Sequence, residues 1–189
     1  EKVYHVVKTK NISDKVKLIT KANSGFGKVL DIGCGTGDFL IRAKEEGWKT
    51  FGFEPNKKAQ IISNTKKINL IEDLDSFEKH SFDVITMWHV LEHVPDLDKQ
   101  IKQIKSLLKP DGLLIIAVPN YKSYDASFYK SDWAAYDVPR HLWHFSKTSI
   151  KKIFQNYQMQ LIHIKPMYFD SFYVSLLSEK YRSGKMNLL

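Results

Sequence analysis

Cysteine is almost absent from this chain of 189 residues, since Cys34 is the one cysteine. A single cysteine excludes an internal disulfide and favours a reducing compartment, so we expect a cytoplasmic protein. No run of about 18 apolar residues is present, which excludes a helix that spans a membrane. No signal-peptide pattern opens the chain, which begins with Glu1 and ends in "KMNLL" (185–189). We expect both ends to be cuts in a longer protein.

Acidic residues are in the minority, and the formal net charge is +8. The lysines are scattered, as in "KQIKQIKSLLK" (99–109), where they alternate with apolar residues. This pattern is typical of the solvated face of a helix, so we do not expect nucleic acid as a partner. The basic balance suits an anionic small molecule.

Repeats are absent, and a hydrophobic content of 43% fits a single domain over 1–189. The oligomeric state leaves no pattern in the sequence.

Apolar runs of strand length alternate with helical patterns along the chain. This alternation favours an α/β fold, a Rossmann-like, doubly wound and mostly parallel sheet with helices on both faces. The run "LLIIAVP" (113–119) is apolar throughout, which suits a central strand covered on both faces. We expect strands at 28–32, 50–54, 68–72, 82–88 and 113–119 and within 159–169. We expect helices at 39–48, 56–67, 96–109, 146–157 and 169–182, and a turn at 110–112.

A long segment without periodicity, 119–146, breaks this alternation. It is rich in Trp, Tyr and Phe, a composition that argues against disorder. Irregular loops of this length in compact domains are usually functional. Because the segment follows a predicted strand, it lies at the carboxyl edge of the sheet, where open α/β folds bind ligands. We therefore interpret it as an insertion on the substrate side of the domain.

The stretch "VLDIGCGTGDF" (29–39) places three glycines between a strand and a helix, where they allow a tight turn and close approach to a ligand. A dinucleotide fingerprint requires a further glycine where Asp38 stands, which disfavours an NAD enzyme. No G-K-[ST] follows, which excludes a Walker loop. The pattern D-x-G-x-G-x-G instead resembles motif I of the class I S-adenosylmethionine-dependent methyltransferases.

Later segments resemble the same family in the same order, over about residues 28–165. "GFEPN" (52–56) puts an acid where it accepts hydrogen bonds from ribose hydroxyls, and "EDL" (72–74) occupies the place beside the adenine. "FDVI", "VLEHV" and "LLKPDGLLIIAVPN" match the later motifs. The resemblance implies a seven-stranded type of sheet without its last strand, S-adenosylmethionine as cofactor, and methyl transfer through alignment of a nucleophile with the S–CH₃ bond. The implied cofactor-binding residues are Asp31, Gly33, Cys34, Gly35, Gly37, Glu54, Pro55, Asp73, Leu74, Trp88 and His89.

Histidines gather in two places that the resemblance puts near the reacting groups. "MWHVLEHVPD" (87–96) follows the fourth strand and passes beside the methionine part of the cofactor. "DVPRHLWHFS" (137–146) resembles the same region of a broad bacterial group, whose members are linked to cell-surface glycans or small metabolites. An Arg and two His there suit an anion clamp, Arg140, and a general base. The candidate catalytic residues are His89, His93, His141 and His144.

A metal site is the alternative interpretation of these histidines. Small-RNA 2′-O-methyltransferases and ubiquinone-pathway O-methyltransferases carry E-x-x-E-H after the fourth strand and a later His, which together hold a divalent metal. This chain resembles that pattern at Glu92, His93 and either His141 or His144. It departs at His89, where the pattern has an acid, and this change shifts preference from Mg²⁺ toward Zn²⁺-like ions. We expect the site to be metal-free.

These observations predict an S-adenosylmethionine-dependent methyltransferase that acts on an oxygen of a small-molecule or glycan-linked acceptor. One alternative is a metal-dependent RNA or catechol-type O-methyltransferase. Another is a cofactor-binding module that has lost catalysis. The acceptor itself leaves no pattern in the sequence.

Overall fold

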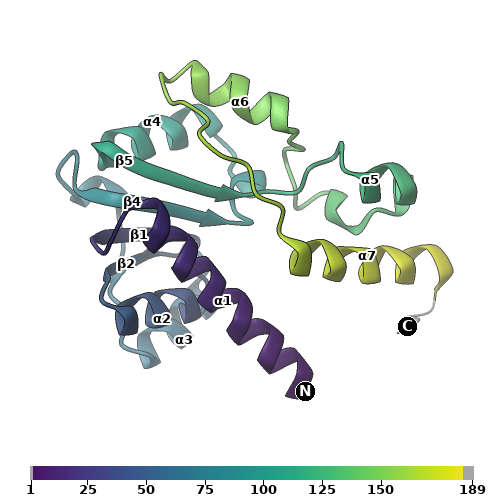
Figure 1. Ribbon diagram of the computed structural model, residues 1–189, viewed down its shortest axis with the longest axis horizontal. Helices are drawn as coiled ribbons and strands as arrows, with labels where there is room; N and C mark the ends of the chain where they lie inside the picture. The colour runs from purple at the N-terminus through teal and green to yellow at the C-terminus, as the bar shows by residue number, and fades with distance from the viewer. Residues whose placement is uncertain (1, 185–189) are drawn as a thin grey trace. The chain divides into compact units, whose positions relative to one another are not determined.

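The computed structural model describes residues 2–184, with the side chains of 2–6 left aside (Figure 1). The chain divides into two compact units. The sheet unit comprises Glu1–Leu91 and Asp96–Ala117, and the second unit comprises Glu92–Pro95 and Val118–Leu189. The expectation of a single domain over the whole chain stays a prediction. The expectation of cut ends rests on Glu1 and 185–189, which lie outside the described residues.

A five-stranded parallel sheet forms the centre of the sheet unit, with the strand order β3-β2-β1-β4-β5. The order reverses between β1 and β4, two neighbours in Figure 1, so the carboxyl ends of these strands flank a topological switch point where α/β sheets bind ligands. This arrangement confirms the predicted Rossmann-like α/β class. The strands are β1 (Lys28–Ile32), β2 (Lys49–Phe53), β3 (Leu70–Ile71), β4 (Phe82–Trp88) and β5 (Leu108–Ala117).

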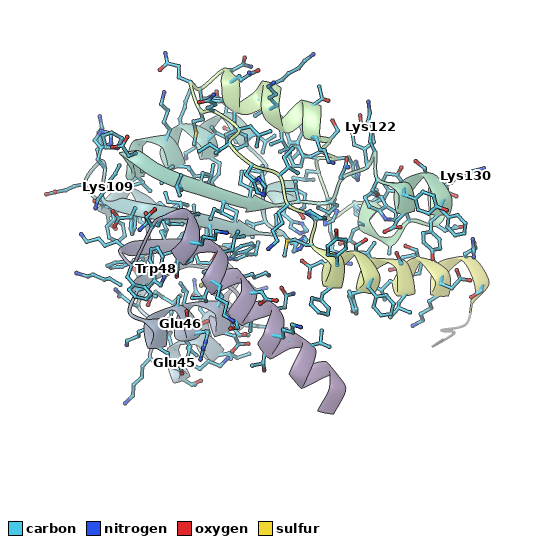
Figure 2. All side chains as sticks on the ribbon, viewed as in Figure 1. Glu45, Glu46, Trp48, Lys109, Lys122 and Lys130 are labelled. Carbon is cyan, nitrogen blue, oxygen red and sulfur yellow. The ribbon has the colours of Figure 1, made fainter. Side chains whose placement is uncertain are left out.

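Helices α1 (Lys2–Ala22) and α2 (Asp38–Glu46) pack against each other in the sheet unit. Their buried side chains share one apolar cluster with side chains from β1 and β4: Val16, Ile19, Phe39, Leu40, Ala43, Val29 and Val84. Trp48, labelled in Figure 2, anchors α1 because its indole N–H donates to Thr20 Oγ1 at 2.9 Å. No predicted element corresponds to α1. Its exposed lysines obscure its apolar face in the sequence. The burial of Val16 and Ile19 in this cluster reveals that face.

The remaining elements of the sheet unit occur in the predicted order, although β3 is shorter than predicted and β5 begins at Leu108 rather than at 113. Helices α3 (Lys57–Thr65) and α4 (Leu97–Leu107) are capped by Asn56 and Asp96, whose side chains accept backbone N–H groups. Two short 3₁₀ helices, η1 (Leu74–Ser76) and η2 (Leu91–His93), follow β3 and β4, and the last two residues of η2 belong to the second unit. The expected turn at 110–112 is instead an irregularity inside β5, where the pairing register with β4 shifts between Phe82 and Val84.

Short helices organise much of the aromatic segment in the second unit. They are α5 (Tyr124–Tyr129), η3 (Lys130–Asp132) and η4 (Ala134–Tyr136), and α7 (Tyr168–Ser183) packs against all three. Buried Trp133 clusters with Ala126 and Ala135, and the hydroxyl of Ser178 accepts the N–H of Ala134 at 2.8 Å. Figure 2 labels Lys122 and Lys130 in this part of the chain. Part of the aromatic content of this segment therefore packs into a local hydrophobic core.

The strand expected within 159–169 is wrong. In the described chain, residues 159–167 belong to no strand, and Ile162 and Ile164 are exposed. An apolar run becomes a strand only where a neighbour completes its hydrogen bonds, and the sheet instead ends at β5. The preceding helix, α6 (Lys147–Gln155), lies within the predicted range 146–157, and Ser146 and Ser149 exchange hydrogen bonds as a capping box at its start. None of the helices within 2–184 has the length and apolarity needed to cross a membrane.

Candidate active site

The glycine loop, residues 33–37, lies between the carboxyl end of β1 and the start of α2. Gly33 and Gly35 both have positive φ angles, 72° and 55°. A methyl group on Gly33 would meet Val90 Cγ2 at 2.4 Å, so the loop packs tightly against the segment after β4. A methyl group on Gly35 would meet nothing within 4 Å. The loop is therefore closed on one side and open on the other, where its backbone can approach a ligand.

Glu54 lies at the end of β2, and its carboxylate is held beside this open face. The residue is only 8% exposed. Its Oε2 accepts the N–H of Gly35 at 2.8 Å, and its Oε1 accepts the N–H of Asn56 at 2.8 Å. Two backbone donors thus orient a buried carboxylate, and each oxygen keeps further acceptor capacity. This geometry suits the predicted hydrogen bonds to ribose hydroxyls.

Asp31, the first residue of the motif, is buried within the sheet rather than displayed on the loop. It is 2% exposed and accepts a 2.6 Å hydrogen bond from Thr86 Oγ1 on β4. Burial raises the pKa of Asp31 to about 7, although the hydrogen bond from Thr86 and the charge of Lys15 oppose the rise. The carboxyl therefore exchanges its proton near neutral pH.

Cys34 is a packed side chain within the loop. Its Sγ would lie 2.8 Å from a methyl group placed on Gly52 of β2, so the thiol fills the space that this glycine leaves. Burial, followed by the charges of Asp31 and Glu54, raises the pKa of the Cys34 thiol to about 12. A thiol of this kind stays protonated and unreactive.

The residues predicted beside the adenine differ in exposure. The side chain of Asp73 accepts the N–H of Asp75 at 2.9 Å and so begins η1. Leu74 is buried, whereas Pro55 is exposed. Their role toward an adenine ring stays a prediction.

Trp88 ends β4 beside the switch point, and His89 follows it directly. The Trp88 ring makes an edge contact with Phe39, with centroids 5.6 Å apart, and Lys15 Nζ lies 4.7 Å from its centroid. His89 is exposed, has a φ of 57°, and donates its backbone N–H to Ala117 O. Lys15 was not predicted at this position, because nothing in the sequence placed α1 near this strand.

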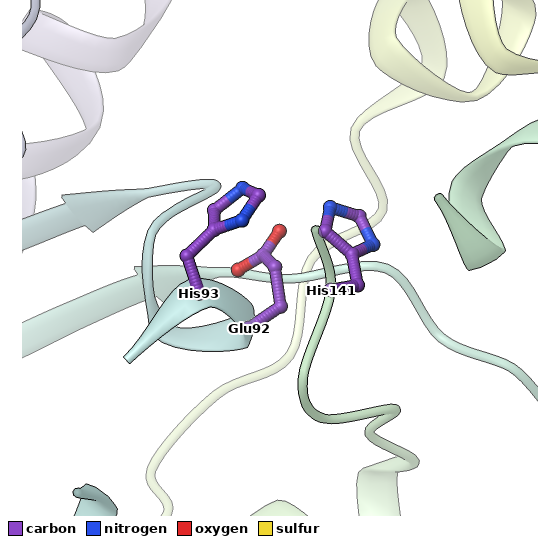
Figure 3. Close-up of side chains that lie close together, drawn as sticks. All are labelled: Glu92, His93 and His141. Atoms are coloured by element: carbon purple, nitrogen blue, oxygen red, sulfur yellow. The ribbon is translucent and has the colours of Figure 1, made fainter. Parts of the chain in front are cut away.

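In the second unit, Glu92, His93 and His141 form a compact cluster (Figure 3). One ligand atom from each residue lies within 4.8 Å of the other two, and Figure 3 shows the Glu92 carboxylate between the two imidazole rings. Glu92 is 1% exposed, whereas His93 is exposed and His141 is half-buried. The structure thus unites three of the predicted residues from distant parts of the sequence.

Backbone carbonyls orient both imidazole rings of the cluster. His93 Nδ1 lies 2.9 Å from Arg140 O, and His141 Nδ1 lies 2.8 Å from Ala135 O. A carbonyl oxygen only accepts, so each Nδ1 carries the proton and each Nε2 has its lone pair available when the ring is neutral. Burial lowers the pKa of His141, although the Ala135 carbonyl and Glu92 act in the opposite direction. The His141 ring is therefore neutral at pH 7 and suited to act as a base or a ligand.

His144 and Arg140 lie outside this cluster. His144 Nε2 contacts Tyr136 O at 2.9 Å, and its ring centroid is 6.5 Å from that of His141. The Arg140 guanidinium binds the Asp137 carboxylate through both Nε and Nη2. An anion at Arg140 would therefore compete with Asp137. The catalytic roles predicted for all four histidines stay predictions.

Comparison with known proteins places this geometry in a family. A family model described as "Methyltransferase domain" matches residues 5–164. Among curated relatives, the ubiquinone biosynthesis O-methyltransferase of Haemophilus ducreyi is 39% identical, with 53% of this chain and 49% of the relative covered. The enzyme of the same name from Actinobacillus pleuropneumoniae serotype 5b is 33% identical, with 67% and 62% covered. The chain thus spans about half to three fifths of the length of these relatives.

Solved structures share the fold. A S-adenosylmethionine-dependent methyltransferase from Archaeoglobus fulgidus superposes with a TM-score of 0.64 at 20% identity, over 95% of this chain and 91% of that chain. At this level of identity the likeness concerns the fold alone. The chain therefore belongs to the methyltransferase domain family and has the Rossmann-like fold of the S-adenosylmethionine-dependent methyltransferases, as its motifs predict.

Proposed function

We propose that the domain transfers a methyl group from S-adenosylmethionine to an oxygen of a small-molecule or glycan-linked acceptor. The observation that carries the proposal is the pairing of Gly35 with Glu54. Gly35 leaves the loop open to a ligand, and its N–H holds the Glu54 carboxylate beside that opening. The residues present therefore fit the cofactor. When bound, S-adenosylmethionine supplies a methyl group on a sulfonium, which needs alignment more than activation.

We assign separate tasks to side chains of the sheet unit and of the second unit. Glu54 binds the ribose hydroxyls, and Trp88 forms one wall of the cofactor site at the end of β4. Where the acceptor is a hydroxyl, a neutral imidazole removes its proton. His141 suits this step because its Nδ1 donates to Ala135 O, which leaves Nε2 to take the proton. His93 has the same arrangement against Arg140 O. The two relatives described above carry the name O-methyltransferase, which supports oxygen as the methyl acceptor.

The first experiment measures binding of S-adenosylhomocysteine by calorimetry, then turnover of S-adenosylmethionine with a panel of hydroxyl and carboxyl metabolites. We expect binding with one site per chain, and the Glu54→Gln variant should bind at least about tenfold more weakly, since an amide places a donor against a backbone N–H. Glu45→Gln on the exposed side of α2 is the matched control. Binding without turnover on any acceptor would favour the module that has lost catalysis.

A metal-assisted O-methyltransferase is the second candidate, and the Glu92, His93 and His141 cluster favours it. Two imidazoles and one carboxylate match the donor set of Zn²⁺-like ions, and backbone bonds to both Nδ1 atoms are the orientation that ligating histidines usually have. Such an ion would bind the acceptor hydroxyls. We test this by titrating Zn²⁺ and Mg²⁺ into protein saturated with S-adenosylhomocysteine. Heat that saturates at one ion per chain and disappears in His93→Ala supports the metal, whereas its absence supports the metal-free site.

We further propose that the protein works in the cytoplasm as an enzyme of small molecules rather than of nucleic acid. The single, buried Cys34 suits a reducing compartment. Scattered lysines offer no concentrated patch for a phosphate backbone. Binding to RNA that weakens steeply as salt rises would contradict the second part of this proposal.

A further inference from the structure

Two carbonyl oxygens of the glycine loop accept hydrogen bonds from side chains at the end of α3. Ser63 Oγ donates to Gly35 O at 2.6 Å, and Lys66 Nζ donates to Thr36 O at 3.1 Å. Neither carbonyl belongs to a strand or helix, because the glycines turn the chain between β1 and α2. These side chains therefore satisfy backbone groups that the turn leaves without a partner in regular structure.

Gly35 is consequently held at both of its polar backbone atoms. Its N–H donates to Glu54, the proposed ribose ligand, and its carbonyl accepts from Ser63. Ser63 is fully buried within α3. Rotation of the peptide that follows Gly35 would thus break a buried hydrogen bond, so the Ser63 hydroxyl restricts the loop to one conformation.

Lys66 connects the loop to the first residue of α2. Besides the Thr36 carbonyl, its ammonium binds the Asp38 carboxylate, which also binds Lys8 of α1 at 2.6 Å. Desolvation acts to raise the pKa of Asp38, but the hydrogen bonds from Lys66 and Lys8 outweigh it, so the pKa of Asp38 is lowered. Asp38 therefore stays ionised at neutral pH and keeps the Lys66 ammonium in place.

The geometry points to Ser63 and Lys66 as positioning residues for the cofactor, which act through the backbone of Gly35 and Thr36. Neither side chain needs to touch the cofactor. They keep the loop in the conformation in which Glu54 is oriented and the face at Gly35 stays open. This inference rests on the proposed use of S-adenosylmethionine, and it adds Ser63 of α3 and Lys66 directly after α3, two residues that the family motifs do not contain.

The test compares Lys66→Met, Lys66→Arg and Ser63→Ala with the parent protein by calorimetry with S-adenosylhomocysteine. Loss of a hydrogen bond from a charged donor predicts about tenfold weaker binding for Lys66→Met. Lys66→Arg should restore most of the affinity, because a guanidinium also donates to both a carbonyl and a carboxylate. Lys67→Met is the matched control, since Lys66 and Lys67 line the same surface hollow of about 480 Å³, whereas among the described residues the loop carbonyls accept from Ser63 and Lys66 and not from Lys67.

A melting temperature recorded beside each titration separates positioning from stability. Unchanged affinity in folded Lys66→Met, or an equal loss in Lys67→Met, would overturn the inference. If Ser63→Ala does not fold, Lys66→Met and Lys66→Arg still decide the question, because Lys66 is partly exposed. Failure of the parent protein itself to bind S-adenosylhomocysteine would instead contradict the proposed function. The two failures are therefore distinguishable.

Discussion

The backbone carbonyl of Glu92 accepts the N–H of Leu142 at 2.8 Å, and this bond joins two segments that are far apart in the sequence. The N–H of Trp143 approaches the same carbonyl at 3.3 Å, and the Trp143 indole N–H donates to Val94 O at 2.7 Å. Together these bonds bring His93 and His141 into contact, with ring centroids 4.7 Å apart. The histidine cluster is therefore built by backbone pairing rather than by the histidines alone.

His141 should be needed for catalysis on hydroxyl acceptors. We expect His141→Gln to lower kcat by about 10²-fold or more, the usual contribution of a positioned general base, while the affinity for S-adenosylhomocysteine is kept. In the parent protein, kcat should fall as the pH drops through the lowered pKa of His141, since protonation removes the Nε2 lone pair. The measurement is a pH–rate profile of both proteins, with His163→Gln, an exposed histidine, as control. An unchanged profile in His141→Gln would contradict this role.

Gly33 should tolerate no side chain, for two separable reasons. Gly33→Ala forces alanine into positive φ, a cost of about 1–2 kcal/mol, and adds a collision with Val90. Gly184→Ala is the matched control, because Gly184 has a φ of 69° and open space around it. Urea unfolding should show a greater loss of stability for Gly33→Ala than for Gly184→Ala, and Val90→Ala should partly rescue the former. Equal losses would show that the contact with Val90 is unimportant.

Asp31 should make the folded protein less stable as the pH rises from about 4 to about 7. Its pKa is raised from 3.8 to about 7 in the folded state, so within this window the folded chain binds more protons than the unfolded chain. The free energy of unfolding therefore falls with rising pH across the window and is level above it. Asp31→Asn resembles the protonated form and should flatten this part of the profile, whereas Asp111→Asn, at an exposed position of β5, should not. Denaturant unfolding from pH 4 to pH 8 is the measurement, and a parallel profile in Asp31→Asn would refute the assignment.

Local patterns predicted much of the sheet unit, because each of its main elements carries its own periodicity and end residues. Strand β4 has the predicted bounds, and α2 ends at Glu46, two residues before the predicted end of that helix. The D-x-G-x-G-x-G pattern led to the loop beside Glu54 for the same reason, since strand, turn and helix follow each other within a few residues. The strand expected within 159–169 failed because strand formation depends on a partner that no local pattern specifies.

What the sequence by itself determined is the family, the Rossmann-like fold class and the residues at the ends of β1, β2 and β4. These follow from short-range patterns of glycine, acid and apolar residues. Only the tertiary structure decided which groups meet. It selected His141 rather than His144 for the cluster with Glu92 and His93, placed Lys15 over Trp88, and joined Ser63 and Lys66 to the glycine loop. Such contacts depend on how separate elements pack against one another, and the spacing of residues along the chain does not specify this packing.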